Sequence, residues 1–468
     1  MRSRILGARV IDPASGLDQV RDLYLDGGKL AAFDQAPAGF VADQDIDARG
    51  LIASPGLVDL SVALREPGYS RKGNIASETL AAAAGGVTSL CCPPLTKPVL
   101  DTPAVAELIL DRAQEAGHTK VFPIGALTKG LAGEQLAELV ALRDAGCVAF
   151  GNGLAPLAGN RNLRRALEYA ATFDLTVVFH AQDADLAASG LAHEGATASF
   201  LGLAGIPETA ETVALARDLL LVEQSGVRAH FSQITSARGA EMIASAQARG
   251  LPVTADVAMY QLILTDEALL GFSSLYHVQP PLRTAFDRDG LREAVKNGVI
   301  GAIASHHQPH EADAKLAPFG ATEPGISSAE LLLPLALTLV QDGLLDLPTL
   351  LARLTNGPAK ALRLPAGRLA VGAPADITLF DAAGQTLAGE TWRSKGGNCP
   401  FIGHCLPGQV RYTLVDGRIG IRGNVLFALN SDQLQPEGRV LLKSLAQPLA
   451  GYLRTRDEAL MVSGFTDD

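Results

Sequence analysis

The feature that most constrains the fold is a repeated alternation between residues 55 and 361. Eight short runs of apolar and β-branched residues each precede a longer Ala- and Leu-rich segment with helical spacing of its apolar positions. Strands that alternate with helices pair in parallel, and eight such units predict a closed (β/α)8 barrel of the TIM type. An open doubly wound sheet is the alternative. The runs span 56–63, 86–92, 120–127, 147–153, 176–183, 227–234, 252–259 and 299–307.

The chain on either side of this block has a different texture. Residues 1–54 and 362–424 contain short runs of alternating apolar residues separated by Gly-rich turns, as in DLYLDGGKLAAFD. This pattern predicts antiparallel strands. We predict that the two flanks join in space as a composite β-sandwich beside a barrel formed by 55–361. Residues 425–468 have only a weak helical pattern and are predicted to be a tail or arm, whose role the sequence does not indicate.

Charge and cysteine content exclude several classes of function. The chain has 468 residues and a formal net charge of -11, with no run of Lys or Arg, so nucleic acid and anionic membranes are not expected as partners. The longest apolar run, 331–340, is about half a membrane span and contains a proline. The five cysteines form no C-x-x-C pair, which is typical of reduced thiols. We therefore expect a cytoplasmic protein.

Polar residues at the carboxyl ends of the eight runs are the candidate site, because barrel enzymes place their chemistry there. A catalytic zinc needs about three protein ligands drawn from His, Cys, Asp and Glu. The only end rich in histidine is the eighth, and the acids after the seventh run, Asp256, Asp266 and Glu267, are expected to be solvated. The candidate polar residues at the ends of the first, fourth, fifth, sixth and eighth runs are Ser61, Asn152, His180, His230, Gln233, Ser305, His306, His307 and His310.

Several motifs, in order along the chain, resemble those of dihydroorotases in the cyclic amidohydrolase family. The resemblance runs from residue 1 to about 420. It implies a zinc-dependent barrel enzyme that opens or closes a cyclic amide, with a small β-sandwich built from both flanks. The motifs that carry it are GLVDLSVALREPG at 56–68, HAQD at 180–183, AHFSQITS at 229–236, VQPPLR at 278–283 and AIASHHQPH at 302–310.

The same resemblance implies that most of the family's site is missing. The paired zinc-binding histidines of the first strand correspond to Ser61 and Ala63. The other family ligands correspond to Asn152, Gln233 and His306, of which the last replaces an aspartate that is both ligand and proton carrier, while the fifth-strand histidine is retained as His180. Leu95 and Gln279 stand where substrate-binding asparagines are expected. Arg65 alone remains from the group expected to hold a substrate carboxylate.

Each replacement weakens zinc binding for a chemical reason. Alanine cannot coordinate a metal, serine and neutral amides bind zinc poorly, and one imidazole cannot supply the shell that lowers the pKa of bound water to about 7. The sequence therefore predicts no catalytic residues, no metal and no other cofactor. The chain also looks similar to inactive dihydroorotase-like chains that accompany aspartate carbamoyltransferase, the preceding enzyme of pyrimidine synthesis. That resemblance implies an assembly subunit in a hetero-oligomer that also self-associates.

Two other functions remain open at this stage. One is a working cyclic amidohydrolase, which hydrolyses a cyclic amide C–N bond, with zinc in a rearranged site. Its ligands would come from His180, His230, His306 and His307. The other is a small-molecule sensor in which Arg65 anchors an anion. The structural alternatives are that His180 is a packed residue bonded to a neighbouring carbonyl, and that Arg65 and Glu66 form an ion pair or cap a loop.

Overall fold

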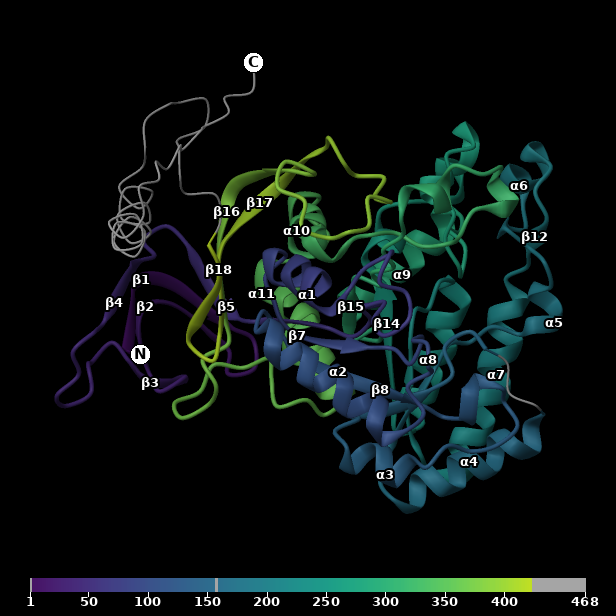
Figure 1. Cartoon of the computed structure of the whole chain (residues 1–468). Coiled ribbons are helices and arrows are strands. Elements are labelled where there is room, and N and C mark those ends of the chain that lie inside the picture. Colours follow the sequence, from purple (N-terminus) through teal and green to yellow (C-terminus); the bar gives the residue numbers. More distant parts are fainter. Residues whose placement is uncertain (1, 156–158, 423–468) are drawn as a thin grey trace, which may run out of the picture. The chain divides into compact units, whose positions relative to one another are not determined.

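The computed structural model describes residues 2–155 and 159–422, shown in Figure 1. Parallel strands at all eight predicted runs form one sheet in chain order, which confirms the predicted barrel. A bridge between Val62 and His307 joins the first and last strand segments and completes the ring. The barrel strands are β6 (Leu57–Asp59), β7 (Val87–Cys92), β8 (Lys120–Ala126), β9 (Ala149–Gly151), β10 (Thr176–Phe179), β13 (Arg228–Phe231), β14 (Val253–Ala258) and β15 (Ala302–Ala304).

The barrel strands are short apolar runs because parallel strands in a barrel are covered on both faces. Every residue of β7 and of β10 is buried. At Gly151 in β9 an added Cβ would lie 2.6 Å from the carbonyl oxygen of Val178. Glycine at this position therefore allows β9 to approach β10 closely.

Helices surround the barrel, as Figure 1 shows. The apolar sides of these helices and the outward-facing strand residues share one large hydrophobic cluster. Side-chain caps fix several helix starts; Asn74 and Ser77, for example, form a reciprocal capping box on α1. The helices are α1 (Ile75–Ala84), α2 (Pro103–Ala116), α3 (Leu139–Asp144), α4 (Asn160–Thr172), α7 (Thr209–Ser225), α8 (Ala237–Ala248), α9 (Ala285–Asn297), α10 (Leu332–Gln341), α11 (Leu347–Leu354) and α12 (Asn356–Ala361).

Both flanks contribute strands to a second sheet. The sheet has the order β18-β17-β16-β5-β1-β2-β3, with β4 paired to β1. Antiparallel pairing of β5 with β16, in which Ala53 faces Leu379, joins the two flanks of the barrel segment. The predicted arm at 425–468 lies outside the described residues. The strands are β1 (Arg2–Asp12), β2 (Leu17–Asp26), β3 (Lys29–Phe33), β4 (Gln44–Asp47), β5 (Ile52–Pro55), β16 (Ile377–Leu387), β17 (Cys405–Val415) and β18 (Arg418–Arg422).

Three long connections after β10, β14 and β15 build up the rim of the barrel mouth. They carry short elements that the sequence did not indicate, including a small parallel sheet of β11 and β12. Within the described residues, no helix combines the length and the apolar character needed to cross a membrane. The rim elements are α5 (Ala184–Ala187), β11 (Ala192–His193), α6 (Ala196–Leu201), β12 (Gly205–Ile206), η2 (Met259–Leu262), η3 (Asp266–Gly271), η4 (Ser274–Tyr276), η5 (Ala312–Lys315), η6 (Phe319–Ala321) and η7 (Ala329–Leu331); η1 (Lys129–Leu131) follows β8.

Candidate functional site

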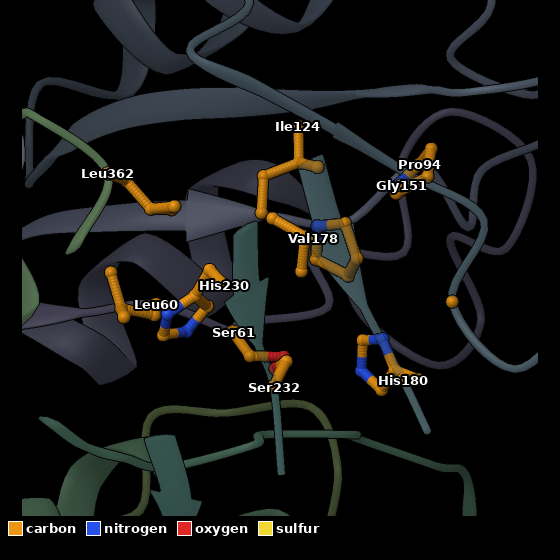
Figure 2. A pocket seen from close by; sticks show the side chains of 12 residues that line it. Leu60, Ser61, Pro94, Ile124, Gly151, Val178, His180, His230, Ser232 and Leu362 are labelled. Carbon is orange, nitrogen blue, oxygen red and sulfur yellow. The ribbon is translucent and has the colours of Figure 1, made fainter. Parts of the chain in front are cut away.

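The strand ends surround a very small cavity. Its volume is about 10 Å³, which is room for about one water molecule. Figure 2 shows Ser61, His180, His230 and Ser232 around this space, together with apolar side chains that include Leu362. Among the described residues, this cavity at the strand ends, where a barrel enzyme would hold its substrate, is therefore too small for more than about one water molecule.

Asp256, at the end region of β14, is the centre of a buried polar network. Its Oδ2 lies 2.8 Å from Nε2 of His230 and accepts a 3.0 Å hydrogen bond from the hydroxyl of Ser232. Its Oδ1 lies 2.7 Å from Nε2 of His306 and accepts a 2.8 Å hydrogen bond from the backbone N–H of Gln233. The carboxylate thus ties together residues that follow or belong to β13, β14 and β15.

The expectation that Asp256 is solvated is wrong. Its side chain is fully buried, and Asp266 is buried as well, whereas Glu267 is exposed. Burial by itself would raise the pKa of Asp256, but the facing imidazoles of His306 and His230 outweigh it and hold the pKa well below its usual range. The carboxylate is therefore ionised, and its charge is matched by hydrogen-bond donors on both oxygens.

His180 has a different environment from the other two imidazoles. Its Nδ1 is buried and has no hydrogen-bond partner among the described residues, so the expected bond from this nitrogen to a neighbouring carbonyl is not present. The ring stands edge-on to His306, with 6.4 Å between centroids. Burial, with a smaller effect of His306, lowers the pKa of His180 to about 4. The side chain is therefore uncharged near pH 7.

His307 is bonded outside the network that contains His230 and His306. Its Nε2 lies 2.7 Å from Oε2 of Glu78 in α1, while Nδ1 accepts hydrogen bonds from the backbone N–H groups of Ser328 and Ala329 at 3.0 and 3.2 Å. Because Nδ1 is an acceptor, the ring carries its proton on Nε2 and donates it to Glu78. The side chain joins α1 to the rim and is not available to the site.

Four of the positions that the resemblance assigns to metal ligands hold other residues, and each of these makes structural contacts. The backbone of Ser61 and of Ala63 bonds to that of His307 at 3.1 and 2.9 Å and closes the barrel. The amide of Asn152 exchanges hydrogen bonds with Thr128, and Nε2 of Gln233 donates to the hydroxyl of Tyr260 at 2.8 Å.

Comparison with known proteins agrees with this architecture. A profile described as dihydro-orotase-like matches residues 50–239, and an amidohydrolase family profile matches 337–421. A "Dihydroorotase-like protein" of Pseudomonas aeruginosa is 78% identical over 423 residues, which cover 90% of this chain and 100% of the relative. The chain belongs to the dihydroorotase family. The resemblance of the motifs to this family is therefore confirmed.

More distant members of the family and its structural neighbours extend the comparison. A "Dihydroorotase" of Syntrophotalea carbinolica is 43% identical, covering 90% of this chain and 99% of the relative. The solved L-hydantoinase (dihydropyrimidinase) of Arthrobacter aurescens superimposes with a TM-score of 0.78 at 25% identity, over 89% of this chain and 95% of that one. The barrel and its flanking sheet are therefore arranged as in cyclic amidohydrolases.

The residues at the mouth do not fit the zinc centre that the family implies. Among residues 2–155 and 159–422, no three His, Cys, Asp or Glu side chains are grouped so that they could hold a metal ion. His230 and His306 are bonded to Asp256. Nδ1 of His180 and Oδ2 of Asp59 are buried without partners among the described residues, but two such atoms are fewer than the three ligands that a zinc site needs.

Arg65 is absent from the lining of the cavity. Its Nε donates to the carbonyl of Pro309 at 3.1 Å, and a terminal nitrogen lies 3.2 Å from Nε2 of His310. Burial lowers the pKa of the guanidinium. Glu66 accepts a 3.0 Å hydrogen bond from the backbone N–H of Ile75 at the start of α1. Of the two structural alternatives for this pair, loop capping by Glu66 is the one present.

One buried polar group near the mouth was missed at the sequence level. Arg283, at the end of the VQPPLR motif, is 3% exposed and donates from Nε to the hydroxyl of Thr235 at 2.6 Å. Its other nitrogens lie 3.1 Å from Nδ1 of His193 and 3.8 Å from Glu211. The motif marked this position, but only the fold shows that the guanidinium ties the β11 segment to α7 and to the end of β13.

Proposed function

We propose that this chain is a catalytically silent member of the dihydroorotase family that acts as a structural subunit for aspartate carbamoyltransferase. One observation carries the first half of the proposal. Of the positions that the resemblance assigns to zinc, His180 alone keeps an imidazole that is not bonded to a carboxylate. His306 is bonded to Asp256, and the remaining positions hold side chains that ligate zinc poorly or not at all, namely Ser61, Ala63, Asn152 and Gln233.

The chemistry of ring opening supports catalytic silence. A metal-bound hydroxide at neutral pH requires about three protein ligands and an open fourth position. Recruiting His230 and His306 as ligands would remove the donors that compensate the buried charge of Asp256, at a cost of about 3–5 kcal/mol for an uncompensated buried charge. The cavity of about 10 Å³ also leaves no room for a cyclic substrate.

The partner in this proposal comes from the likeness to inactive dihydroorotase-like chains that accompany the transferase. The retained barrel supports it, because the chain keeps a large rigid outer surface while the mouth is filled. A stable complex buries about 1,200–2,000 Å² or more, which the rim and outer helices can supply. We place the chain in a hetero-oligomer in which its own copies also touch.

Catalytic silence is tested by metal content and turnover. After purification with added zinc, elemental analysis is expected to find well under one zinc per chain. Opening of dihydroorotate and closing of carbamoyl aspartate are expected to stay at background. They should also stay there after Ser61→His with Ala63→His, because Asn152, Gln233, His306 and Leu95 remain unchanged. Zinc-dependent turnover by the unmodified chain would refute the proposal.

The assembly role is tested by expressing aspartate carbamoyltransferase with and without this chain. The transferase is expected to co-elute with the chain in a larger complex and to lose size or turnover without it. A transferase of unchanged size and full activity that never co-elutes would rule this role out.

A zinc-dependent cyclic amidohydrolase is the second candidate. It is favoured by the 43% identity to a protein named "Dihydroorotase" and by the unpartnered Nδ1 of His180. Tightly held stoichiometric zinc that disappears on His180→Ala and on His306→Ala would support it. Catalytic silence remains the better supported of the two functions. His307 is turned toward Glu78 and is not available as a further zinc ligand.

A further inference from the structure

We infer that the rim of the barrel mouth is a docking surface for a basic, amphipathic segment of a partner protein. The surface is formed by four exposed apolar side chains, Phe200, Leu270, Phe272 and Leu316, which we call the rim patch. The inference deepens the proposed function and rests on it only for the identity of the partner.

Three rim connections bring the patch together. A small hydrophobic cluster separate from the main core contains Ala198 of α6, Leu269 of η3 and Phe319 of η6. The hydroxyl of Ser274 donates to the carbonyl of Lys315 at 2.6 Å, which fixes the residue before Leu316 against η4. The patch residues therefore lie on segments whose neighbouring residues share one cluster, and Figure 1 shows α6 at the periphery of the molecule.

The exposure of the patch is large for apolar side chains. Phe200 and Leu316 are 80% and 79% exposed, and Leu270 and Phe272 are 51% and 52% exposed. At about 150–250 Å² for a large side chain, the four expose roughly 500 Å² of apolar surface. A patch of this size marks interaction sites in many proteins and approaches the roughly 800 Å² that one partner contributes to a standard interface.

The backbone at Phe272 adds a second observation. Its φ is +52°, in the left-handed region that a bulky residue seldom adopts. The strain is held at the end of η3 while the aromatic ring stays half exposed. Strain of this kind is enriched at functional sites, and at this position it places an exposed aromatic ring close in the sequence to Leu270, another patch residue.

Charge around the patch determines what can bind. Segments 184–206, 266–276 and 312–322 contain no Arg and a single Lys. That residue, Lys315, is buried and donates to the carbonyls of His277 and Glu323. The exposed charged side chains of the three segments are all acidic, namely Asp185, Glu194, Glu267 and Asp313.

An apolar patch with an acidic border selects one kind of occupant. A second copy of the same face would bring like charges together, which disfavours self-pairing. A segment with apolar anchors flanked by Lys or Arg is complementary in both respects. Because the three segments follow β10, β14 and β15, such a partner would cover the mouth of the barrel.

The first test uses the full chain and a defined probe. The probe is a synthetic helix-forming peptide with leucines on one face and lysines on the other, compared with its leucine–glutamate counterpart. We expect the lysine peptide to bind about tenfold more tightly, and Phe200→Ser with Phe272→Ser to weaken it about tenfold. Val213→Ser with Leu220→Ser, two exposed apolar positions on α7, is the matched control and should leave binding unchanged.

The second test uses the transferase. The patch variant is expected to co-elute with it less than the unmodified chain and the α7 control do. Equal peptide binding by the patch variant and the control, or self-association that the patch variant abolishes, would overturn the inference. If the transferase binds the patch variant fully, its contact lies elsewhere and the inference fails while the proposed function stands. If the transferase never binds the unmodified chain, the proposed function fails, and the peptide experiment alone decides the inference.

Discussion

Two buried imidazole–carboxylate pairs start from adjacent residues and serve different parts of the molecule. His306 faces Asp256 inside the mouth at 2.7 Å, and His307 faces Glu78 at the same distance on the side of α1. The φ of His306 is +46°, a turn that directs the two neighbouring side chains to different surroundings. The inner pair links strand ends, whereas the outer pair fastens the rim.

The two pairs differ in how many imidazoles each carboxylate faces. Asp256 has two imidazoles as partners, so the histidines that could have served a metal instead compensate one carboxylate. Glu78 has one imidazole and also accepts from the hydroxyl of Ser394 at 2.6 Å and the backbone N–H of Lys395 at 3.1 Å. Both pairs are structural, but only the inner one occupies the place of a catalytic centre.

Breaking the inner pair should have the largest effect. Asp256→Asn removes the charge that both imidazoles face, and we expect it to lower the free energy of unfolding by about 3–5 kcal/mol. Urea unfolding measures this. Asp218→Asn, at a buried aspartate on α7 whose pKa burial raises to about 6, is the control and should change stability by less than about 1 kcal/mol. An equal loss of unfolding free energy in Asp256→Asn and Asp218→Asn would contradict a special stabilising role of the Asp256 network.

Breaking the outer pair should cost less and act locally. Glu78→Gln keeps the size of the side chain but weakens charge-assisted hydrogen bonds to His307 and Ser394, so we expect a loss of about 2–3 kcal/mol. Hydrogen exchange should become faster in residues 393–398, because their contacts to α1 are loosened. Unchanged exchange in this segment together with slower refolding of the barrel strands would instead place Glu78 in the barrel.

The pH dependence separates the carboxylates from His180. The pKa values of Asp256 and Glu78 are lowered, so their stabilisation is present above about pH 4 and is lost as pH falls further. The pKa of His180 is lowered to about 4, so its contribution is lost earlier, as pH falls from about 6.5 toward 4. The slope of the free energy of unfolding against pH reports the number of protons taken up on unfolding. His180→Asn should reduce that number in this pH window by at most about one. Urea midpoints between pH 8 and pH 4.5 measure this slope. An unchanged slope would contradict a neutral His180 ring in the folded chain.

Glu330, a carboxylate beside the outer pair, should change stability with pH in the opposite direction to Asp256 and Glu78. Its effect should be the smallest of those predicted. Burial raises the pKa of Glu330 to about 7, although backbone N–H groups of Arg393 and Ser394 partly offset it. The folded chain therefore keeps a proton that the unfolded chain loses between about pH 4.5 and 7, and stability falls as pH rises through this window. The free energy of unfolding of Glu330→Gln, relative to that of the unmodified chain, should therefore be higher at pH 8 than at pH 5. We expect this difference to be under about 1 kcal/mol. Destabilisation like that of Glu78→Gln would show that Glu330 is ionised and bonded.

Local pattern accounts for what could be predicted. The eight strand runs, among them TVVF at 176–179, are recognisable because a strand covered on both faces must be continuously apolar. The positions of Ser61 and Ala63 relative to the family motif were also readable, because the neighbouring residues of the motif are unchanged.

Only the tertiary structure decided the partners of the polar residues that remain. Asp256 was expected in solvent and is buried between His230 and His306, and Arg283 was expected only as part of a motif. His306 and His307 are neighbours in sequence, yet one lies inside the mouth and the other faces α1. The sequence by itself determined the barrel and the residue types at its strand ends, because both can be read from local pattern. The fold alone determined which charges meet, because Asp256 and His306 are 50 residues apart and pair only when their strands are adjacent.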